Sequence, residues 1–344
     1  MLLELRDLGL YCPAGDFYID PWGAVPRAVL THAHADHARF GSHAYLVAQP
    51  GEPVFRARLG DSVLQPVSYG ARVDINGVQI SLHPAGHLLG SAQVRIEHRG
   101  EVWVVSGDYK RASDSTCTPF EVVPCHTFIT ESTFGLPIFR WAPSEEVFAQ
   151  INNWWRSNQA AGRASVLLGY ALGKAQRLLS GLDPTIGPIY THGAVERLVQ
   201  AYRDAGVALP ETSYAAAATT HDWSQAIILA PPSAQGTPWL RRFGDYATGL
   251  ASGWMQVRGT RRRRAVDRGF VLSDHVDWPD LLDTIAATGA ERVWVTHGYT
   301  AVVVRWLQEQ SIEALAIQTR FEGEQSEAEL EPEPESGKRK RHGD

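Results

Sequence analysis

Short apolar runs rich in β-branched and aromatic residues recur through residues 1–143, separated by Gly, Pro, Asp and Asn. Runs of this length, bounded by turn residues, predict β-strands. The predicted strands cover 17–20, 28–31, 78–83, 93–97, 102–106 and 127–130. Polar residues that can do chemistry lie at or just past the ends of several of them: Asp20, His32, Asp108 and Glu131. Because sites are commonly built on loops beyond strand ends, we expect these side chains near a functional centre.

From Pro143 onward the pattern changes to alternating helices and strands. Residues 144–157 predict a helix that Ser144 caps, with acidic residues in its first turn. The other predicted elements up to residue 230 are helices at 174–180 and 194–202 and strands at 164–168, 189–190 and 226–230. This alternation is typical of βαβ units with a parallel sheet. Farther along, strands are predicted at 269–272 and 292–296, and helices at 279–287 and 301–310.

A histidine-rich loop follows the predicted strand 28–31. It reads Thr-His-Ala-His-Ala-Asp-His and contains four side chains that can bind metals: His32, His34, Asp36 and His37. Imidazole and carboxylate together suit Zn²⁺, with manganese or iron as alternatives. A polar surface loop is the other interpretation, but four such residues at this spacing favour a metal site.

Length and composition indicate a large globular chain. With 344 residues and 44% hydrophobic content, it can form two domains or one domain with a large insertion. No apolar run is long enough to span a bilayer, and the charged N-terminus differs from a signal peptide. The three cysteines, Cys12, Cys117 and Cys125, have no CxxC spacing, which fits a reducing compartment and disfavours a cysteine-built zinc site. We therefore predict a cytoplasmic protein with no membrane partner.

The formal net charge of −6 is dominated by the C-terminal tail. Residues 322–344 hold seven Glu and one Asp against four Lys or Arg, so the rest of the chain has 28 basic and 30 acidic residues, a net charge of −2. Residues 321–344 have too few apolar positions to fold and are predicted to be disordered. Net charge therefore neither supports nor excludes a polyanionic substrate.

Two groups of motifs resemble known protein families. The histidine-rich loop, Gly86-His87-x-x-Gly90-Ser91 and Ser106-Gly107-Asp108 resemble the signature of the metallo-β-lactamase superfamily. Glu131-Ser132-Thr133, Ser273-Asp274-His275 and Thr296-His297-Gly298 resemble motifs A, B and C of its β-CASP nucleases. The segment 170–176 is similar to the Gly-basic-x-Gln stretch that those nucleases carry at a strand-to-helix turn. Within this branch the chain is most similar to the DNA ligase-associated bacterial exonucleases.

The resemblance implies an α/β fold of a particular kind. It is a four-layer αββα metallo-β-lactamase sandwich with an inserted α/β β-CASP domain. The sandwich would be formed by residues 1–143 and 263–320, and the insert by residues 144–262. Residues 321–344 would form the charged tail.

The resemblance also implies two metal sites. One site would use His32, His34, His87 and Asp108, and the other would use Asp36, His37, Asp108 and His297. Asp108 would bridge the two ions. Asp20 would orient the ligand loop through hydrogen bonds.

The chemistry that follows is hydrolysis of a phosphodiester bond. Two zinc ions, with Mn²⁺ as an alternative, would lower the pKa of a shared water so that a bridging hydroxide attacks phosphorus. The resemblance gives catalytic roles to Asp36 and Asp108 at the metals. His275 would assist the leaving oxygen, and Glu131 would orient His275. The products would be a 5′-phosphate and a 3′-hydroxyl.

Two basic segments are candidates for contacts with nucleic acid. Lys174 follows Gly173 at a predicted helix start, where backbone N–H groups and the helix dipole favour an anion. We therefore expect a phosphate contact from Gly173, Lys174 and Gln176. Arg261 and Arg262 belong to the run 261–264, which is either a grip on the nucleic-acid backbone or a solvated loop.

Three functions are compatible with these motifs. The first is a DNA exonuclease in repair that works with a DNA ligase and a helicase, with DNA favoured over RNA. The second is an RNA-processing nuclease, because a histidine at the position of His297 is more typical of RNA-acting members of the family. The third is a small-molecule metallo-hydrolase such as a thioesterase, which the large insert and the Glu131–His275 pair disfavour.

Overall fold

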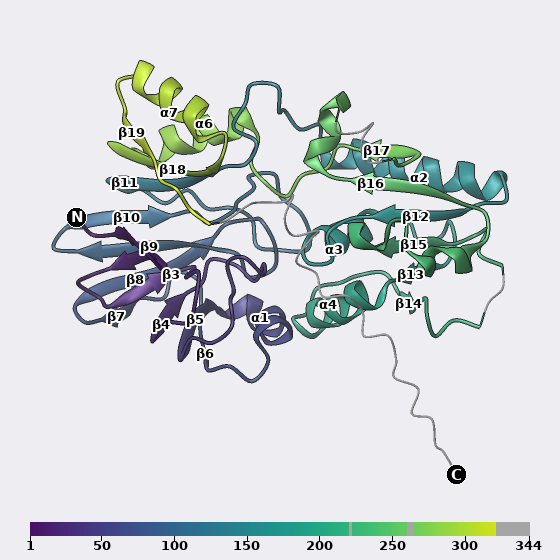
Figure 1. The fold of residues 1–344 in the computed structure, drawn as a ribbon, viewed down its shortest axis with the longest axis horizontal. Coiled ribbons are helices and arrows are strands. Elements are labelled where there is room, and N and C mark those ends of the chain that lie inside the picture. The colour runs from purple at the N-terminus through teal and green to yellow at the C-terminus, as the bar shows by residue number, and fades with distance from the viewer. Residues whose placement is uncertain (220–221, 260–264, 321–344) are drawn as a thin grey trace, which may run out of the picture.

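The computed structural model describes residues 1–219, 222–259 and 265–320 of the chain. They form two lobes that lie side by side (Figure 1). The first lobe contains two β-sheets, and the second contains a third sheet. The chain passes to the second lobe after strand β11 (Thr127–Ser132) and returns to the first lobe at helix α6 (Trp278–Thr288).

The first sheet has the strand order β1-β2-β3-β4-β5-β6. Its first three strands pair antiparallel, and the pairs from β3 to β6 are parallel. Its strands are β1 (Glu4–Arg6), β2 (Gly9–Cys12), β3 (Phe17–Ile19), β4 (Arg27–Val29), β5 (Ala44–Ala48) and β6 (Leu64–Val67).

The second sheet has the order β19-β18-β11-β10-β9-β8-β7. Strands β7 to β10 pair antiparallel, whereas β10, β11, β18 and β19 pair in parallel. Besides β11, its strands are β7 (Val73–Ile75), β8 (Val78–Pro84), β9 (Ala92–His98), β10 (Glu101–Val105), β18 (Arg292–Gly298) and β19 (Glu313–Ala316).

These two sheets pack face to face, and helices cover their outer faces. Alternate residues of a strand point to opposite faces, so Leu46 of β5 packs between the sheets while Tyr45 and Val47 pack on the outer side. Helix α1 (Glu52–Leu59) covers the outer face of the first sheet. Helices α6 and α7 (Thr300–Glu309) cover that of the second sheet.

The third sheet is entirely parallel, with the order β14-β13-β15-β12-β16-β17. This confirms the parallel sheet predicted from the alternating pattern. Its strands are β12 (Ala164–Leu168), β13 (Ile189–Thr191), β14 (Ser213–Tyr214), β15 (Ile227–Ala230), β16 (Tyr246–Ala251) and β17 (Arg268–Phe270). Its helices are α2 (Ser144–Ala160), α3 (Lys174–Gly181) and α4 (Gly193–Asp204). Four 3₁₀ helices complete the described elements: η1 (Gln49–Gly51), η2 (Pro232–Ala234), η3 (Pro238–Phe243) and η4 (Gly253–Gln256).

Two details differ from the sequence-based expectations. Strand β17 pairs with β16, so residues 268–270 belong to the third sheet although the expected boundary places 263–320 in the other domain. Pro143, not Ser144, occupies the N-cap of α2, and the Ser144 hydroxyl accepts a hydrogen bond from Arg177 Nη2 at 2.7 Å. The hydroxyl that would have capped α2 therefore binds helix α3 instead.

A single hydrophobic cluster joins the two lobes. It includes Val47 and Phe55 of the first lobe together with Leu172 and Leu179 of the second. Leu88, from the loop between β8 and β9, belongs to the same cluster. Because these side chains share one core, the lobes form a continuous packed unit at this junction.

The mixed α/β class is confirmed by the three sheets and their helices. Among the described residues, no helix is long and apolar enough to cross a membrane.

Candidate metal centre

The histidine-rich loop begins directly after strand β4 and is held in place by Asp20. The Asp20 carboxylate accepts hydrogen bonds from the Thr31 backbone N–H at 2.8 Å and from Thr31 Oγ1 at 2.5 Å. Its Oδ2 atom also lies 2.7 Å from His37 Nδ1. Asp20 itself has a φ of 43°, a conformation that costs energy for a non-glycine residue. Its carboxylate therefore fixes both ends of the loop, as expected for an orienting residue.

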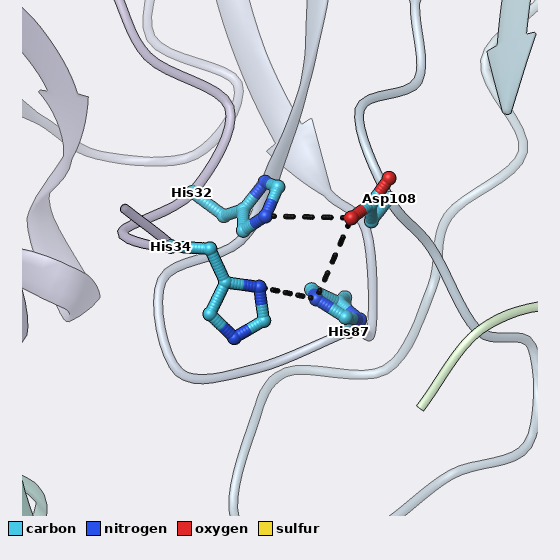
Figure 2. A group of neighbouring side chains, drawn as sticks. All are labelled: His32, His34, His87 and Asp108. Carbon is cyan, nitrogen blue, oxygen red and sulfur yellow. Dashed lines mark hydrogen bonds and ion pairs between the residues drawn. The ribbon is translucent and has the colours of Figure 1, made fainter. Parts of the chain in front are cut away.

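Four side chains point toward a common position (Figure 2). His32 Nε2 lies 3.5 Å from Asp108 Oδ2, and His87 Nε2 lies 3.9 Å from the same oxygen. His34 Nδ1 lies 3.2 Å from His87 Nε2. One nitrogen of each imidazole and one carboxylate oxygen thus face one another, in the combination expected for the first metal site.

The second predicted set also gathers around Asp108. His37 Nε2 is 3.7 Å from Asp36 Oδ2 and 3.8 Å from Asp108 Oδ2. His297 Nε2 is 3.1 Å from Asp108 Oδ1. Asp108 is therefore shared by the two sets: its Oδ1 faces His297, and its Oδ2 faces His37 as well as His32. We call the seven residues the histidine cluster: His32, His34, Asp36, His37, His87, Asp108 and His297.

The second ring nitrogen of several histidines is held by a group outside the cluster. His34 Nε2 donates to the carbonyl of Leu172 at 3.3 Å, and His87 Nδ1 donates to the carbonyl of Asp274 at 2.8 Å. Metal-binding histidines usually donate their other N–H in this way, because the bond fixes the ring and leaves the second nitrogen for the metal. Leu172 belongs to the second lobe, so that lobe takes part in orienting the cluster.

Burial and neighbouring charges shift the pKa values of the loop histidines in opposite directions. Burial, reinforced by nearby imidazoles, holds the pKa of His32 and of His87 well below the usual value of 6.5. Burial also lowers the pKa of His37, but the carboxylates of Asp36 and Asp20 outweigh it and raise that pKa to about 10. His32 and His87 are therefore neutral at pH 7, which is the form that binds a metal.

Asp108 is ionised because the histidines around it stabilise the charge of its carboxylate. Burial raises the pKa of its carboxyl, but His275, His297 and His37 together hold it well below the usual range. An ionised, buried carboxylate between imidazoles is suited to hold a cation.

The residues present fit a divalent cation. Within the described ranges, His32 Nε2 and Asp36 Oδ1 are buried without a hydrogen-bond partner. Buried polar atoms are normally paired, so such exceptions indicate a missing partner. Three overlapping groups of His, Asp and Glu bring ligand atoms within 4.8 Å of one another: His32/His34/His87/Asp108, Asp20/His32/His37 and Asp108/Glu131/His297.

Glu131 and His275 form a pair beside this cluster. His275 Nδ1 lies 2.9 and 3.0 Å from the two carboxylate oxygens of Glu131, which also accepts the Tyr109 backbone N–H at 2.9 Å. The His275 and His87 ring centroids are 4.8 Å apart. Trp141 Nε1 donates to the His275 carbonyl at 2.9 Å, which fixes the backbone as well.

The structure corrects the expected phosphate contact at residues 173–176. Lys174 and Gln176 are both 0% exposed, and Lys174 Nζ binds Asp274 Oδ2 and the Leu272 carbonyl, each at 2.9 Å. Gln176 closes the helix start by accepting the Gly173 N–H at 2.8 Å. A buried, paired lysine cannot contact a phosphate in solution. The other two candidates, Arg261 and Arg262, lie outside the described residues.

The sequence analysis did not predict a buried network of charged side chains that is centred on Asp274, the residue before His275. It consists of Lys110, Asp114, Lys174, Arg177 and Asp274, and we call it the Asp274 network. Arg177 Nη1 binds Asp274 Oδ1 at 2.7 Å, and Lys110 binds Asp114. The local sequence signals were Lys174 and Arg177, three residues apart at one helix start, and the Lys110–Asp114 pair, four residues apart. They did not reveal the network, because Asp274 lies 97 residues from Arg177 in the chain.

A pocket of about 200 Å³ opens next to His275. Both connections between the lobes contribute to it, through Trp141 and Ser144 on the outgoing side and Ser273 on the returning side. Two tryptophans of the second lobe, Trp155 and Trp223, are buried in its hydrophobic clusters, so they are not exposed for stacking on bases.

Comparisons with known proteins relate the chain to proteins named as a probable DNA ligase and as endoribonucleases. The chain is 31% identical over 314 residues to a protein of Opitutus terrae named "Probable DNA ligase", covering 90% of this chain and 30% of that protein. It is 33% identical over 122 residues to "Endoribonuclease YSH1" of Saccharomyces cerevisiae, covering 35% of this chain and 15% of that protein. The chain thus spans less than a third of the length of either relative.

A solved structure from Enterococcus faecalis V583, described as a protein of unknown function, shares the fold. Its TM-score is 0.58 at 10% identity, over 86% of this chain and 79% of that one. No family model matches the chain. The Opitutus terrae protein and the Ysh1 endoribonucleases support a relationship between this chain and the β-CASP nucleases of the metallo-β-lactamase superfamily.

Proposed function

We propose that this chain is a metal-dependent nuclease that uses two Zn²⁺ ions and degrades DNA as an exonuclease in repair. The observation that carries the proposal is the convergence of the buried histidine cluster beside the Glu131–His275 pair. The relationship to the Ysh1 endoribonucleases supports a phosphodiester substrate.

We assign the first lobe to a four-layer αββα metallo-β-lactamase sandwich and the second to an inserted β-CASP domain. The two face-to-face sheets with helices on both outer faces support the first assignment. The second assignment is supported by the parallel third sheet, because all its strands lie in the chain between β11 and β18, which are neighbours in the first lobe.

The histidine cluster would hold the two ions. His32, His34, His87 and Asp108 would bind one, and Asp36, His37, Asp108 and His297 would bind the other, with Mn²⁺ as the alternative metal. Bound divalent cations would supply Lewis acidity that activates water for attack on phosphorus and neutralises charge building on the phosphate.

His275 would complete the reaction by protonating the leaving oxygen. Its Nδ1 donates to Glu131, which leaves Nε2 to carry the proton that the departing 3′ oxygen requires. Glu131 is held in turn by the Tyr109 N–H, so the carboxylate fixes the ring without moving. The pocket beside His275 gives the substrate access to this group.

DNA is the favoured substrate, and RNA is the second candidate. The relative named as a probable DNA ligase matches 90% of this chain, which supports a role beside a DNA ligase. A helicase partner stays a prediction from the resemblance. RNA is the second candidate for two reasons: the Ysh1 relatives are named endoribonucleases, and a histidine at the position of His297, which lies 3.1 Å from Asp108, is more typical of the RNA-acting members of the family that the motifs resemble.

One assay separates these possibilities. End-labelled single- and double-stranded DNA and RNA, with 5′-phosphate or 5′-hydroxyl ends, are incubated with and without a chelator and after zinc is restored. We expect cleavage that stops with the chelator, returns with zinc and proceeds stepwise from a DNA end. Faster cleavage of RNA would transfer the assignment to an RNA-processing nuclease. Chelator-resistant cleavage would contradict the metal assignment.

A further inference from the structure

Residues 272–274 form the return connection between the lobes, and their backbone reaches the metal centre. The Asp274 carbonyl accepts the His87 Nδ1–H at 2.8 Å, and the next residue is His275. The orientation of this short segment therefore fixes a predicted metal ligand and the predicted proton donor at once.

Two cations from helix α3 hold this segment. Lys174 Nζ donates to the Leu272 carbonyl and to the Asp274 carboxylate, each at 2.9 Å. Arg177 Nη1 donates to the Ser273 carbonyl and to Asp274 Oδ1. Residues three apart lie on one face of a helix, so a single turn of α3 contacts three consecutive residues.

The side chains that make these contacts are buried, so water cannot replace a lost partner without a change in the structure. Lys174, Arg177 and Asp274 are 0%, 3% and 5% exposed. Lys174 and Arg177 lie 2.9 and 2.7 Å from the two oxygens of the Asp274 carboxylate, so this buried carboxylate is paired with a cation on each side. A buried charge that loses its partner must be rehydrated or neutralised, and either outcome displaces the segment that carries it.

We propose that Lys174 and Arg177 are positioning residues that orient His87 and His275 through residues 272–274. The second lobe then contributes to metal retention through these contacts as well as through the Leu172 carbonyl on His34. This inference rests on the proposed metal-dependent function, because it assigns these residues a role at the metal centre.

The test measures zinc affinity in the folded protein. Arg177→Met is compared with Arg156→Met, a control on the surface of α2 whose side chain is 51% exposed and pairs with Asp183. Zinc affinity is measured by competition with a chromogenic chelator, and circular dichroism checks the fold. Groups that orient metal ligands typically matter 10–100-fold, so we expect a loss of about that size for Arg177→Met and a change below about twofold for the control. A folded Arg177→Met protein with wild-type zinc affinity would overturn the proposal.

Two further variants keep the test decisive if Arg177→Met fails to fold. Asp274→Asn keeps the shape and the backbone carbonyl but removes the charge that both cations hold. Ser144→Ala is the mildest change, because it removes only the hydroxyl that binds Arg177 Nη2. We expect both to weaken zinc binding, with Asp274→Asn the larger effect. Unchanged zinc affinity in both would also overturn the proposal.

A kinetic readout separates positioning from substrate contact. Lys174 is fully buried and lies outside the pocket beside His275, so Lys174→Met should lower kcat and leave KM unchanged. A rise in KM alone would contradict positioning. Wild-type protein that binds no zinc would refute the proposed function itself, whereas wild-type binding with equal binding by the variants would refute only this inference.

Discussion

The histidine cluster and the Asp274 network are both buried at the junction of the lobes, but they use their polar atoms differently. In the Asp274 network each cation has a carboxylate partner, as Lys174 and Arg177 do on Asp274. In the histidine cluster, as far as the structure describes the chain, His32 Nε2 and Asp36 Oδ1 have no hydrogen-bond partner. One atom of the Asp274 network, Arg177 Nε, also has no hydrogen-bond partner among the described residues, but it lies 3.7 Å from the Asp114 carboxylate, so each cation there faces an anion. The atoms without a partner in the histidine cluster are a ring nitrogen and a carboxylate oxygen, both of which can bind a cation. Residue types alone do not separate a structural cluster from a candidate binding site; the kind of atom left without a partner does.

The largest expected effect tests the histidine cluster. Asp108→Ala removes the carboxylate that the two predicted ligand sets share, so phosphodiester cleavage should fall by more than the roughly 100-fold upper range for groups that only orient ligands. Initial rates on end-labelled DNA measure this, and circular dichroism verifies that the fold is kept. A folded variant with near wild-type activity would eliminate Asp108 as a ligand.

The next effect separates proton transfer from metal binding. Glu131→Gln leaves the shape but removes the charge that holds His275 Nδ1, so kcat should fall by about 10²-fold, the lower range for general acid–base catalysis. Bound zinc, measured by elemental analysis, should stay at the wild-type level. Loss of zinc together with activity would instead make Glu131 a ligand, in line with its place near Asp108 and His297.

The Asp274 network should respond mainly in stability. Arg177→Met leaves the buried Asp274 with one partner fewer, which should lower the free energy of unfolding by about 3–5 kcal/mol. The exposed control Arg156→Met should lower it by about 0–1 kcal/mol. Urea unfolding of the two variants provides the comparison. Equal losses would mean that the network is no more important to the fold than a surface ion pair.

The last prediction concerns the pH dependence of the stability of the metal-free protein. Between pH 6.5 and about 10 the folded chain keeps a proton on His37 that the unfolded chain releases, so stability should fall as pH rises. Below pH 6.5 the unfolded chain protonates His32 and His87 while the folded chain resists, so stability should fall as pH drops. Urea unfolding across this range should therefore show a maximum near pH 6.5. A steady rise from pH 5 to pH 9 would contradict the pKa of His37.

The sequence allowed much of the centre to be predicted because its residues follow strand ends. His32, Asp108 and Glu131 come after β4, after β10 and within β11, and the sheets bring these ends together. Strand β12 was predicted with its observed bounds, 164–168, because a buried parallel strand is a continuous apolar run.

Other features could not be read from local pattern. Lys174 has the local signature of an anion site, but its partner Leu272 lies 98 residues away, and only the packing of the lobes brings them together. Helix α1 was not predicted either. It begins at Glu52-Pro53 directly after Gly51, a sequence that resembles a turn, although proline is well tolerated in the first turn of a helix.

The hydrogen bond from His34 to the Leu172 carbonyl has an evolutionary consequence. His34 and Leu172 are 138 residues apart in the chain, yet the Leu172 carbonyl helps to set the orientation of the His34 imidazole. A second lobe grafted from a distant relative would bring its own turn at this position and would misalign the recipient's histidine. Among relatives of this chain, the turn at 170–176 and the loop at 31–37 should therefore change together, as an inherited unit rather than as exchangeable modules.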